Sequence, residues 1–276
     1  MSDSPAPLVP AEGWHVMHLY YSIDHSQWSL LSDSEKREAK TELSQLVQEI
    51  RSHPKTQLLI FAVATPKADL GFMLLTPDLQ DATHFEKRLT LALGPDVLTP
   101  TYSYLSQTES SEYTTTPEQY ARDTLVGEKG LTEGSPEYEE GLKEFEERMK
   151  HYLQHRLYPV LPDWPVICFY PMSKRRSAHP DYNWYSLDHD ARAQLMKGHA
   201  TTGRKYAGKI LQLITGSTGL DEHEWGVTLL AKDTIEIKNI VYEMRFDAVS
   251  ARYADFGDFY IGMQMPLNDL FKRICL

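Results

Sequence analysis

Strand-like and helix-like hydrophobic patterns alternate in a definite order along the N-terminal part of the chain. Residues 14–23 are aromatic and apolar, whereas Leu43, Leu46 and Ile50 recur at helical spacing. We expect strands at 14–23, 57–64, 71–76 and 101–107, and helices from about residue 33 onward and at 79–93. The order is therefore strand, helix, strand, strand, helix, strand.

The C-terminal part of the chain repeats that order. We expect strands at 166–170, 209–215, 224–231 and 256–263, and helices at 188–201 and 234–243. The two middle strands form a hairpin around the turn at 216–221. A βαββαβ order that occurs twice is the ferredoxin-like pattern in duplicate. We predict an α+β fold of the dimeric α+β barrel type, in which two sheets pack face to face with helices outside.

The same patterns divide the chain into segments. We predict a disordered N-terminus at 1–13, a first ferredoxin-like repeat at 14–113, an acidic connector at 114–162 and a second repeat at 163–276. The connector contains a helical stretch at 136–153. A solvated connecting helix and a lid or interface element are both compatible with it.

Charge and cysteine content exclude several classes of protein. The 276 residues carry 28 Lys and Arg against 39 Asp and Glu, a net charge of −11, which argues against nucleic acid or an anionic membrane as the main partner. Two cysteines are too few for a disulfide scaffold or a four-ligand zinc site. Without a long apolar run or an apolar signal at the N-terminus, the sequence indicates a cytoplasmic protein with no membrane span.

His199 is the histidine whose context favours chemistry. It follows Leu195 by four residues, on the apolar face of the helix expected at 188–201. A core histidine with satisfied hydrogen bonds is one interpretation, and an iron ligand is the other. A single imidazole can hold a haem iron because the porphyrin supplies four other ligands.

A second cluster lies at the end of the strand expected at 166–170. Tyr170 is followed by the cations Lys174, Arg175 and Arg176. A tyrosine in this position could take part in redox or proton transfer, and the cations could hold carboxylates. An ordinary strand end with a solvated basic turn is the alternative.

Three long stretches carry a resemblance to a known family. They are YPMSKRR, MKGHATTGRKYAGKILQLITGSTGLDEHEWGVTLLAKD and KNIVYEMRFDAVSARYADFGDFYIG, in that order. Together with NWYSL, they closely resemble the coproheme decarboxylases of the chlorite dismutase-like superfamily. The match is strongest over 156–263 and weaker over 14–113. It implies a porphyrin bound by the second repeat and assembly as a homopentamer.

The resemblance implies specific roles in the reaction. His199 matches the proximal iron ligand, which favours the ligand interpretation of this residue. Tyr170 matches the tyrosine that becomes a radical and abstracts hydrogen from a propionate. Lys174 matches the lysine that assists at the second propionate.

The remaining matches line the porphyrin site. Arg156 and Ser250 match propionate-binding positions, and Met172 matches a residue that lines the same site. Gln212 matches the distal glutamine of one branch of the superfamily. Tyr113 matches a further propionate contact.

The activity implied is oxidative decarboxylation with hydrogen peroxide. Two propionates of iron coproporphyrin III (coproheme) become vinyl groups, and haem b forms through a three-propionate intermediate. A ferrochelatase of the same pathway is a candidate partner. A non-enzymatic haem or coproheme carrier is the alternative, but a carrier would need neither Tyr170 nor Lys174. Chlorite-degrading relatives have a distal arginine, so Gln212 argues against chlorite dismutase or peroxidase chemistry.

Overall fold

The computed structural model describes residues 6–276, and the predicted disorder of residues 1–5 lies outside that range. The described residues form two compact units, one of residues 6–108 and 161–276 and the other of residues 109–160. Residues 6–13 contain no helix or strand. They are nevertheless tied to the first unit, since the Leu79 amide donates to the Leu8 carbonyl over 3.1 Å.

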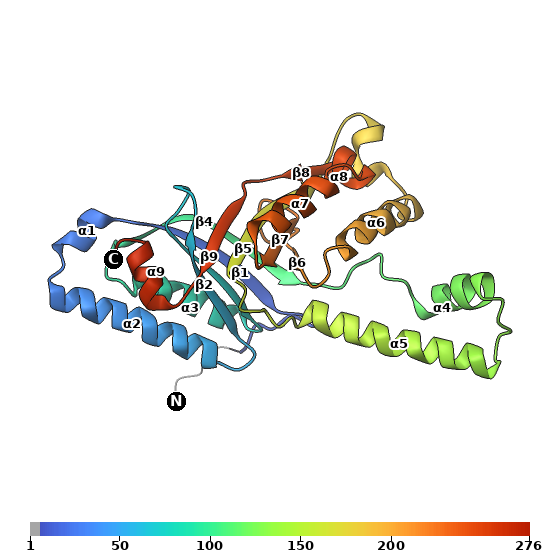
Figure 1. The fold of residues 1–276 in the computed structure, drawn as a ribbon, viewed down its shortest axis with the longest axis horizontal. Helices are drawn as coiled ribbons and strands as arrows, with labels where there is room; N and C mark the ends of the chain where they lie inside the picture. The colour runs from blue at the N-terminus through green and yellow to red at the C-terminus, as the bar shows by residue number, and fades with distance from the viewer. Residues whose placement is uncertain (1–5) are drawn as a thin grey trace. The chain divides into compact units, whose positions relative to one another are not determined.

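The first unit is built around one nine-stranded antiparallel array (Figure 1). Its strands are β1 His15–Ile23, β2 Gln57–Val63, β3 Leu70–Thr76, β4 Leu98–Thr108, β5 Val166–Lys174, β6 Ile210–Gly216, β7 Trp225–Ala231, β8 Ala254–Phe256 and β9 Tyr260–Gln264. The first repeat has the order β4-β1-β3-β2 and the second β9-β5-β7-β6. Both orders are those of a ferredoxin-like sheet, so the predicted duplicate fold is confirmed.

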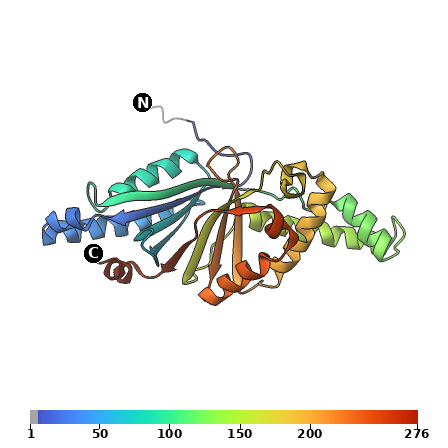
Figure 2. The ribbon, with the colours of Figure 1, turned by 90° about the horizontal axis from the view of Figure 1, so that it is seen from above.

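Two short ladders join the repeats into a closed barrel. β2 pairs with β9 over Phe61 to Val63, and β4 pairs with β6 at Gln107 and Thr108. Figure 2 shows the blue and teal strands of the first repeat beside the olive and orange strands of the second. The barrel interior is filled from both repeats, by residues that include Tyr20, Phe61 and Phe169.

Helices cover the outer faces of the barrel. In the first unit they are α1 His25–Leu30, α2 Asp33–Ser52, α3 Leu79–Leu91, α6 His189–Arg204, α7 Thr234–Met244, α8 Ala248–Tyr253 and α9 Leu267–Arg273. Two short 3-10 turns, η2 Pro180–Tyr182 and η3 Trp184–Ser186, precede α6. No helix within residues 6–276 has the length and apolar run needed to cross a bilayer.

The second unit is helical. It consists of α4 Pro117–Tyr120, a π-helical segment η1 Ala121–Glu128 and the long helix α5 Pro136–Leu157. Ser135 caps α5 by accepting a hydrogen bond from the Tyr138 amide, and Tyr120 stacks on Phe145 with ring centroids 4.1 Å apart. The helical stretch expected at 136–153 is therefore present and four residues longer.

Candidate functional site

The outer face of β5 carries three of the predicted site residues. Because side chains alternate along a strand, Tyr170, Met172 and Lys174 project from one face, together with Val166 and Cys168. Strand β5 extends to Lys174, beyond the end expected at residue 170, because β8 pairs with Met172 to Lys174. Lys174 is thus held by a β-ladder rather than placed on a free turn.

Tyr170 lies against an aromatic wall. Its ring stacks on Phe259 with centroids 4.3 Å apart and meets Phe256 edge-on at 5.8 Å. Burial raises the pKa of its phenol well above the ordinary value, although Arg245 opposes this shift. Because burial disfavours the phenolate, this side chain is a neutral phenol packed by rings.

Lys174 is half-buried and its ammonium lies 4.6 Å from the centroid of the Trp184 ring. Burial lowers the pKa of Lys174 to about 8, while the carboxylates of Asp247 and Glu224 partly oppose the shift. A lysine with such a pKa can hold a carboxylate and can also exchange a proton near neutral pH.

His199 is held by a carboxylate that sequence reasoning missed. Its Nδ1–H donates to Oδ2 of Asp247 over 2.8 Å. Because an ionised carboxylate only accepts hydrogen bonds, this contact fixes the proton on Nδ1 and leaves the lone pair of Nε2 available. This is the arrangement commonly found around a metal-binding histidine.

Asp247 also binds Ser250. Asp247 is the N-cap of α8. Its carboxylate accepts a hydrogen bond from the Ser250 amide over 2.8 Å and another from the Ser250 hydroxyl over 3.4 Å. Burial alone would raise the pKa of Asp247, but the hydrogen bonds from His199 and Ser250 outweigh it and hold the pKa below the ordinary value. The sequence signal was the Asp-Ala-Val-Ser cap motif.

Helix α6 is less buried than its apolar pattern predicts. Leu195, Met196 and His199 are each only partly covered, and no residue of the helix is fully buried. The helix packs on α7 and α8 (Figure 1). This face is therefore only partly covered in the described residues, and it can cover an apolar ligand.

Gln212 lies on the outer face of β6, between Ile210 and Ile214, which pack in the cluster that also contains Tyr170. Its side-chain amide donates to the Gly203 carbonyl on α6 over 3.3 Å. The glutamine thus extends from the sheet toward the helix that carries His199.

Arg156 and Tyr113 belong to the second unit. The Arg156 guanidinium donates to the Glu109 carbonyl over 2.9 Å and so ties α5 to the segment that follows β4. The Tyr113 amide donates to the Ser111 hydroxyl over 3.3 Å. Arg156 and Tyr113 therefore belong to a different unit from Tyr170, Lys174 and His199.

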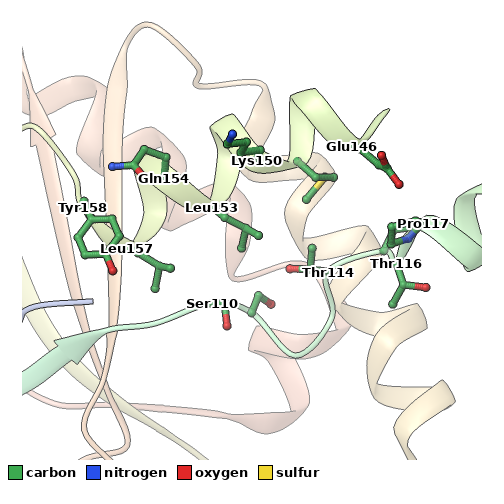
Figure 3. A pocket seen from close by; sticks show the side chains of 13 residues that line it. Ser110, Thr114, Thr116, Pro117, Glu146, Lys150, Leu153, Gln154, Leu157 and Tyr158 are labelled. Carbon is green, nitrogen blue, oxygen red and sulfur yellow. The ribbon is translucent and has the colours of Figure 1, made fainter. Parts of the chain in front are cut away.

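The second unit also contains a cavity of about 690 Å³ (Figure 3). It lies between α5 and the segment from Ser110 to Pro117, and its walls include Met149, Leu153 and Tyr158. None of the eight predicted site residues lines it. This cavity therefore does not locate the predicted chemistry.

Within residues 6–276, no group of three or more His, Cys, Asp and Glu side chains could hold a metal ion. His199 offers a single imidazole, and one imidazole can hold iron when a porphyrin supplies the other ligands. The available Nε2, the half-covered face of α6 and the cationic Lys174 fit an apolar macrocycle that carries carboxylates.

Comparison with known proteins identifies the family. The chlorite dismutase family model matches residues 36–265. The coproheme decarboxylase of Staphylococcus carnosus (strain TM300) is 38% identical over 262 residues, which cover 94% of each chain. A haem-binding protein from Thermus thermophilus superposes with a TM-score of 0.78 at 36% identity, over 99% of this chain and all of that one.

A variant of the chlorite dismutase from Candidatus Nitrospira defluvii has the same fold, with a TM-score of 0.70 at 18% identity over 97% of each chain. The resemblance recognised in the sequence is therefore confirmed by a family match over most of the chain and by near full-length relatives. The chain belongs to the chlorite dismutase family.

Proposed function

We propose that this protein is a coproheme decarboxylase, which converts two propionates of iron coproporphyrin III into the vinyl groups of haem b. The observation that carries the proposal is that Tyr170 and Lys174 project from one face of β5. The same unit contains His199, whose imidazole is hydrogen-bonded to Asp247. The coproheme decarboxylase of Staphylococcus carnosus, similar over nearly the whole chain, supports the same reaction.

Each decarboxylation is an oxidation. A propionic acid side chain loses CO₂, two protons and two electrons as its two remaining carbons become a vinyl group. Hydrogen peroxide accepts the two protons and two electrons and becomes two water molecules. Two such rounds, with a three-propionate intermediate between them, convert coproheme to haem b.

The residues of this chain divide the work by their chemistry. The imidazole of His199 would hold the iron through Nε2, with Asp247 keeping its orientation. Tyr170 offers the redox-active phenol of this face, so it would remove hydrogen from the propionate. Lys174 offers a positive charge and a proton but no redox chemistry, so it would position a carboxylate.

Other residues would bind and orient the substrate. Arg156, Ser250 and Tyr113 are proposed to contact propionates, Met172 to line the site and Gln212 to face an iron-bound ligand. A neutral amide donates and accepts hydrogen bonds but is a poor base, so Gln212 would not deprotonate peroxide.

The resemblance also leads us to propose a cytoplasmic homopentamer that receives coproheme from a ferrochelatase. Light scattering of the purified protein would measure the subunit number. Co-purification with the ferrochelatase would test the delivery step.

The direct test of function uses purified protein, iron coproporphyrin III and hydrogen peroxide. Mass analysis of the porphyrin should show the successive loss of two CO₂ and two pairs of hydrogens. Binding of coproheme without any mass loss would favour the non-enzymatic carrier.

A further inference from the structure

Glu224 is a buried acid that organises the end of β5. It precedes β7 directly and is 7% exposed. One carboxylate oxygen accepts a hydrogen bond from the backbone amide of Lys174 over 2.8 Å. The other oxygen accepts hydrogen bonds from the Arg176 guanidinium, over 2.9 Å, and from the Tyr185 hydroxyl.

The backbone of Glu224 adds to the same junction. Its amide donates to the Met172 carbonyl over 3.1 Å and lies 3.2 Å from the Ser173 hydroxyl. Contacts of this one residue therefore reach Met172, Ser173, Lys174 and Arg176. A buried carboxylate is costly unless it is paired and hydrogen-bonded, so this set of donors stabilises Glu224 in its buried position.

Lys174 is restrained at both ends. Its backbone amide is bound by Glu224, and its ammonium lies over the ring of Trp184, which is 3% exposed. The Trp184 amide in turn donates to the Arg175 carbonyl over 3.1 Å. Because Trp184 and Tyr185 are consecutive in η3, the turn and the strand end are joined on both sides of the lysine.

We propose that Glu224 is a positioning residue that fixes the end of β5 and thereby holds the Lys174 ammonium where it acts on the second propionate. The inference rests on the proposed function, because it assigns Glu224 a role through Lys174. Glu224 itself would not touch the substrate.

Several charges surround the lysine. The carboxylates of Glu224 and Asp247 favour its protonated form. Arg176 pairs with Glu224, while the neighbouring Arg175 pairs with Asp255 over 2.8 Å. Removing the charge of Glu224 should therefore favour the neutral lysine, and removing that of Arg176 should favour the protonated lysine.

The first test is Glu224→Gln. Glutamine has one acceptor oxygen where Glu224 uses two, so it cannot accept from Lys174 on one side and from Arg176 and Tyr185 on the other. Two properties should be preserved. They are the binding of coproheme, measured by visible absorption, and the first loss of CO₂. The second loss should slow about tenfold, because a small displacement of a positioned group is costly, and the three-propionate intermediate should accumulate.

The second test is Arg176→Gln, at a side chain that is 69% exposed and so tolerates change without unfolding. The pH midpoint of the second decarboxylation should move down in Glu224→Gln and up in Arg176→Gln, whichever form of Lys174 is active. A purely structural role would not give shifts of opposite sign. Asp255→Asn, which removes a nearby carboxylate that pairs with Arg175, is the matched control and should leave the midpoint unchanged.

The outcomes separate the two proposals. If the wild-type protein releases no CO₂ from coproheme with peroxide, the proposed function is overturned. If it releases both CO₂ normally, and both variants keep its product ratio and its pH midpoint, the role of Glu224 alone is overturned.

Discussion

Asp247 connects more of the candidate site than any residue that the sequence pattern singled out. It caps α8, accepts a hydrogen bond from His199 and binds Ser250. One carboxylate thus links helix α6 to helix α8 and sets the histidine tautomer. A change at Asp247 would alter the iron ligand, the cap and a proposed propionate contact together.

His199→Ala should abolish the histidine-to-iron bond while leaving the barrel folded, because His199 lies on a half-covered helix face. The measurement is the visible and resonance Raman spectrum of the coproheme complex. Asp247→Asn is a useful companion, since it keeps the shape but weakens the hold on Nδ1. A histidine-type spectrum that survives in His199→Ala would show that iron is bound elsewhere.

Tyr170→Phe should bind coproheme with unchanged affinity and release almost no CO₂. The phenyl ring keeps its packing against Phe259 and Phe256, so only the hydroxyl and its redox chemistry are lost. Lys174→Ala should instead stop after the first decarboxylation. Mass analysis distinguishes the two variants, and normal turnover by Tyr170→Phe would rule out the radical role.

Arg156→Ala should weaken coproheme more than haem b, because coproheme carries four propionates and haem b two. A hydrogen bond to a charged group contributes about 1.5–3 kcal/mol, so we expect about a tenfold or larger loss of coproheme affinity. Titrations followed by absorbance measure both ligands. Equal weakening would argue against a propionate contact that haem b lacks.

The sequence could indicate His199, Tyr170 and Lys174 because they stand within long motifs of a recognisable family. Asp247 and Glu224 could not be assigned in this way. Asp247 is 48 positions from His199 and Glu224 is 50 positions from Lys174, and such contacts depend on the packing of elements rather than on local spacing. Trp184 was part of a quoted motif, but its contact with Lys174 depends on the fold of η3.

At the scale of elements, glycines allow the barrel to close around Phe61. Gly71 on β3 and Gly262 on β9 flank this ring. A Cβ atom would lie 2.1 Å from the ring at Gly71 and 2.2 Å at Gly262. Both strands can therefore approach β2 only because these positions have no side chain.

Gly71→Ala should destabilise the protein by about 1–3 kcal/mol, since the added methyl group must displace a ring that is 1% exposed. Chemical denaturation of the ligand-free protein measures the change. Gly198→Ala is the control, because a methyl group added there, inside α6, would project into open space. That substitution should stabilise by about 0.5–1 kcal/mol, and a similar cost for both would contradict the packing argument.

The order of elements was predictable because alternation and helical spacing are local properties. The expected strand at 256–263 is divided into β8 and β9, since the chain leaves β5 between Phe256 and Tyr260. The ladders that close the barrel involve Gln107 with Gly216 and Val63 with Gly262. Such pairings are long-range, so periodicity alone does not reveal them.

At the scale of the whole molecule, the barrel interior contains polar groups that are not fully satisfied. His18 is completely buried, accepts or donates one hydrogen bond with Thr228 at 2.8 Å and stacks on Phe169. Its Nδ1 and the Tyr20 hydroxyl have no partner in the part of the chain that the structure describes. Burial lowers the pKa of His18 to about 3, so the native barrel holds it neutral.

The stability of the ligand-free protein should therefore fall on acidification. Between pH 6.5 and 3 the unfolded chain binds a proton at His18 that the native state does not, so the free energy of unfolding decreases as pH falls. At pH 5 this histidine should account for a loss of about 2 kcal/mol relative to pH 8. His18→Phe keeps the stack on Phe169 but cannot titrate, so it should lose about 2 kcal/mol less than the wild type over the same range. Urea unfolding of both proteins at the two pH values measures the difference, and parallel losses would mean that the barrel admits a charged His18.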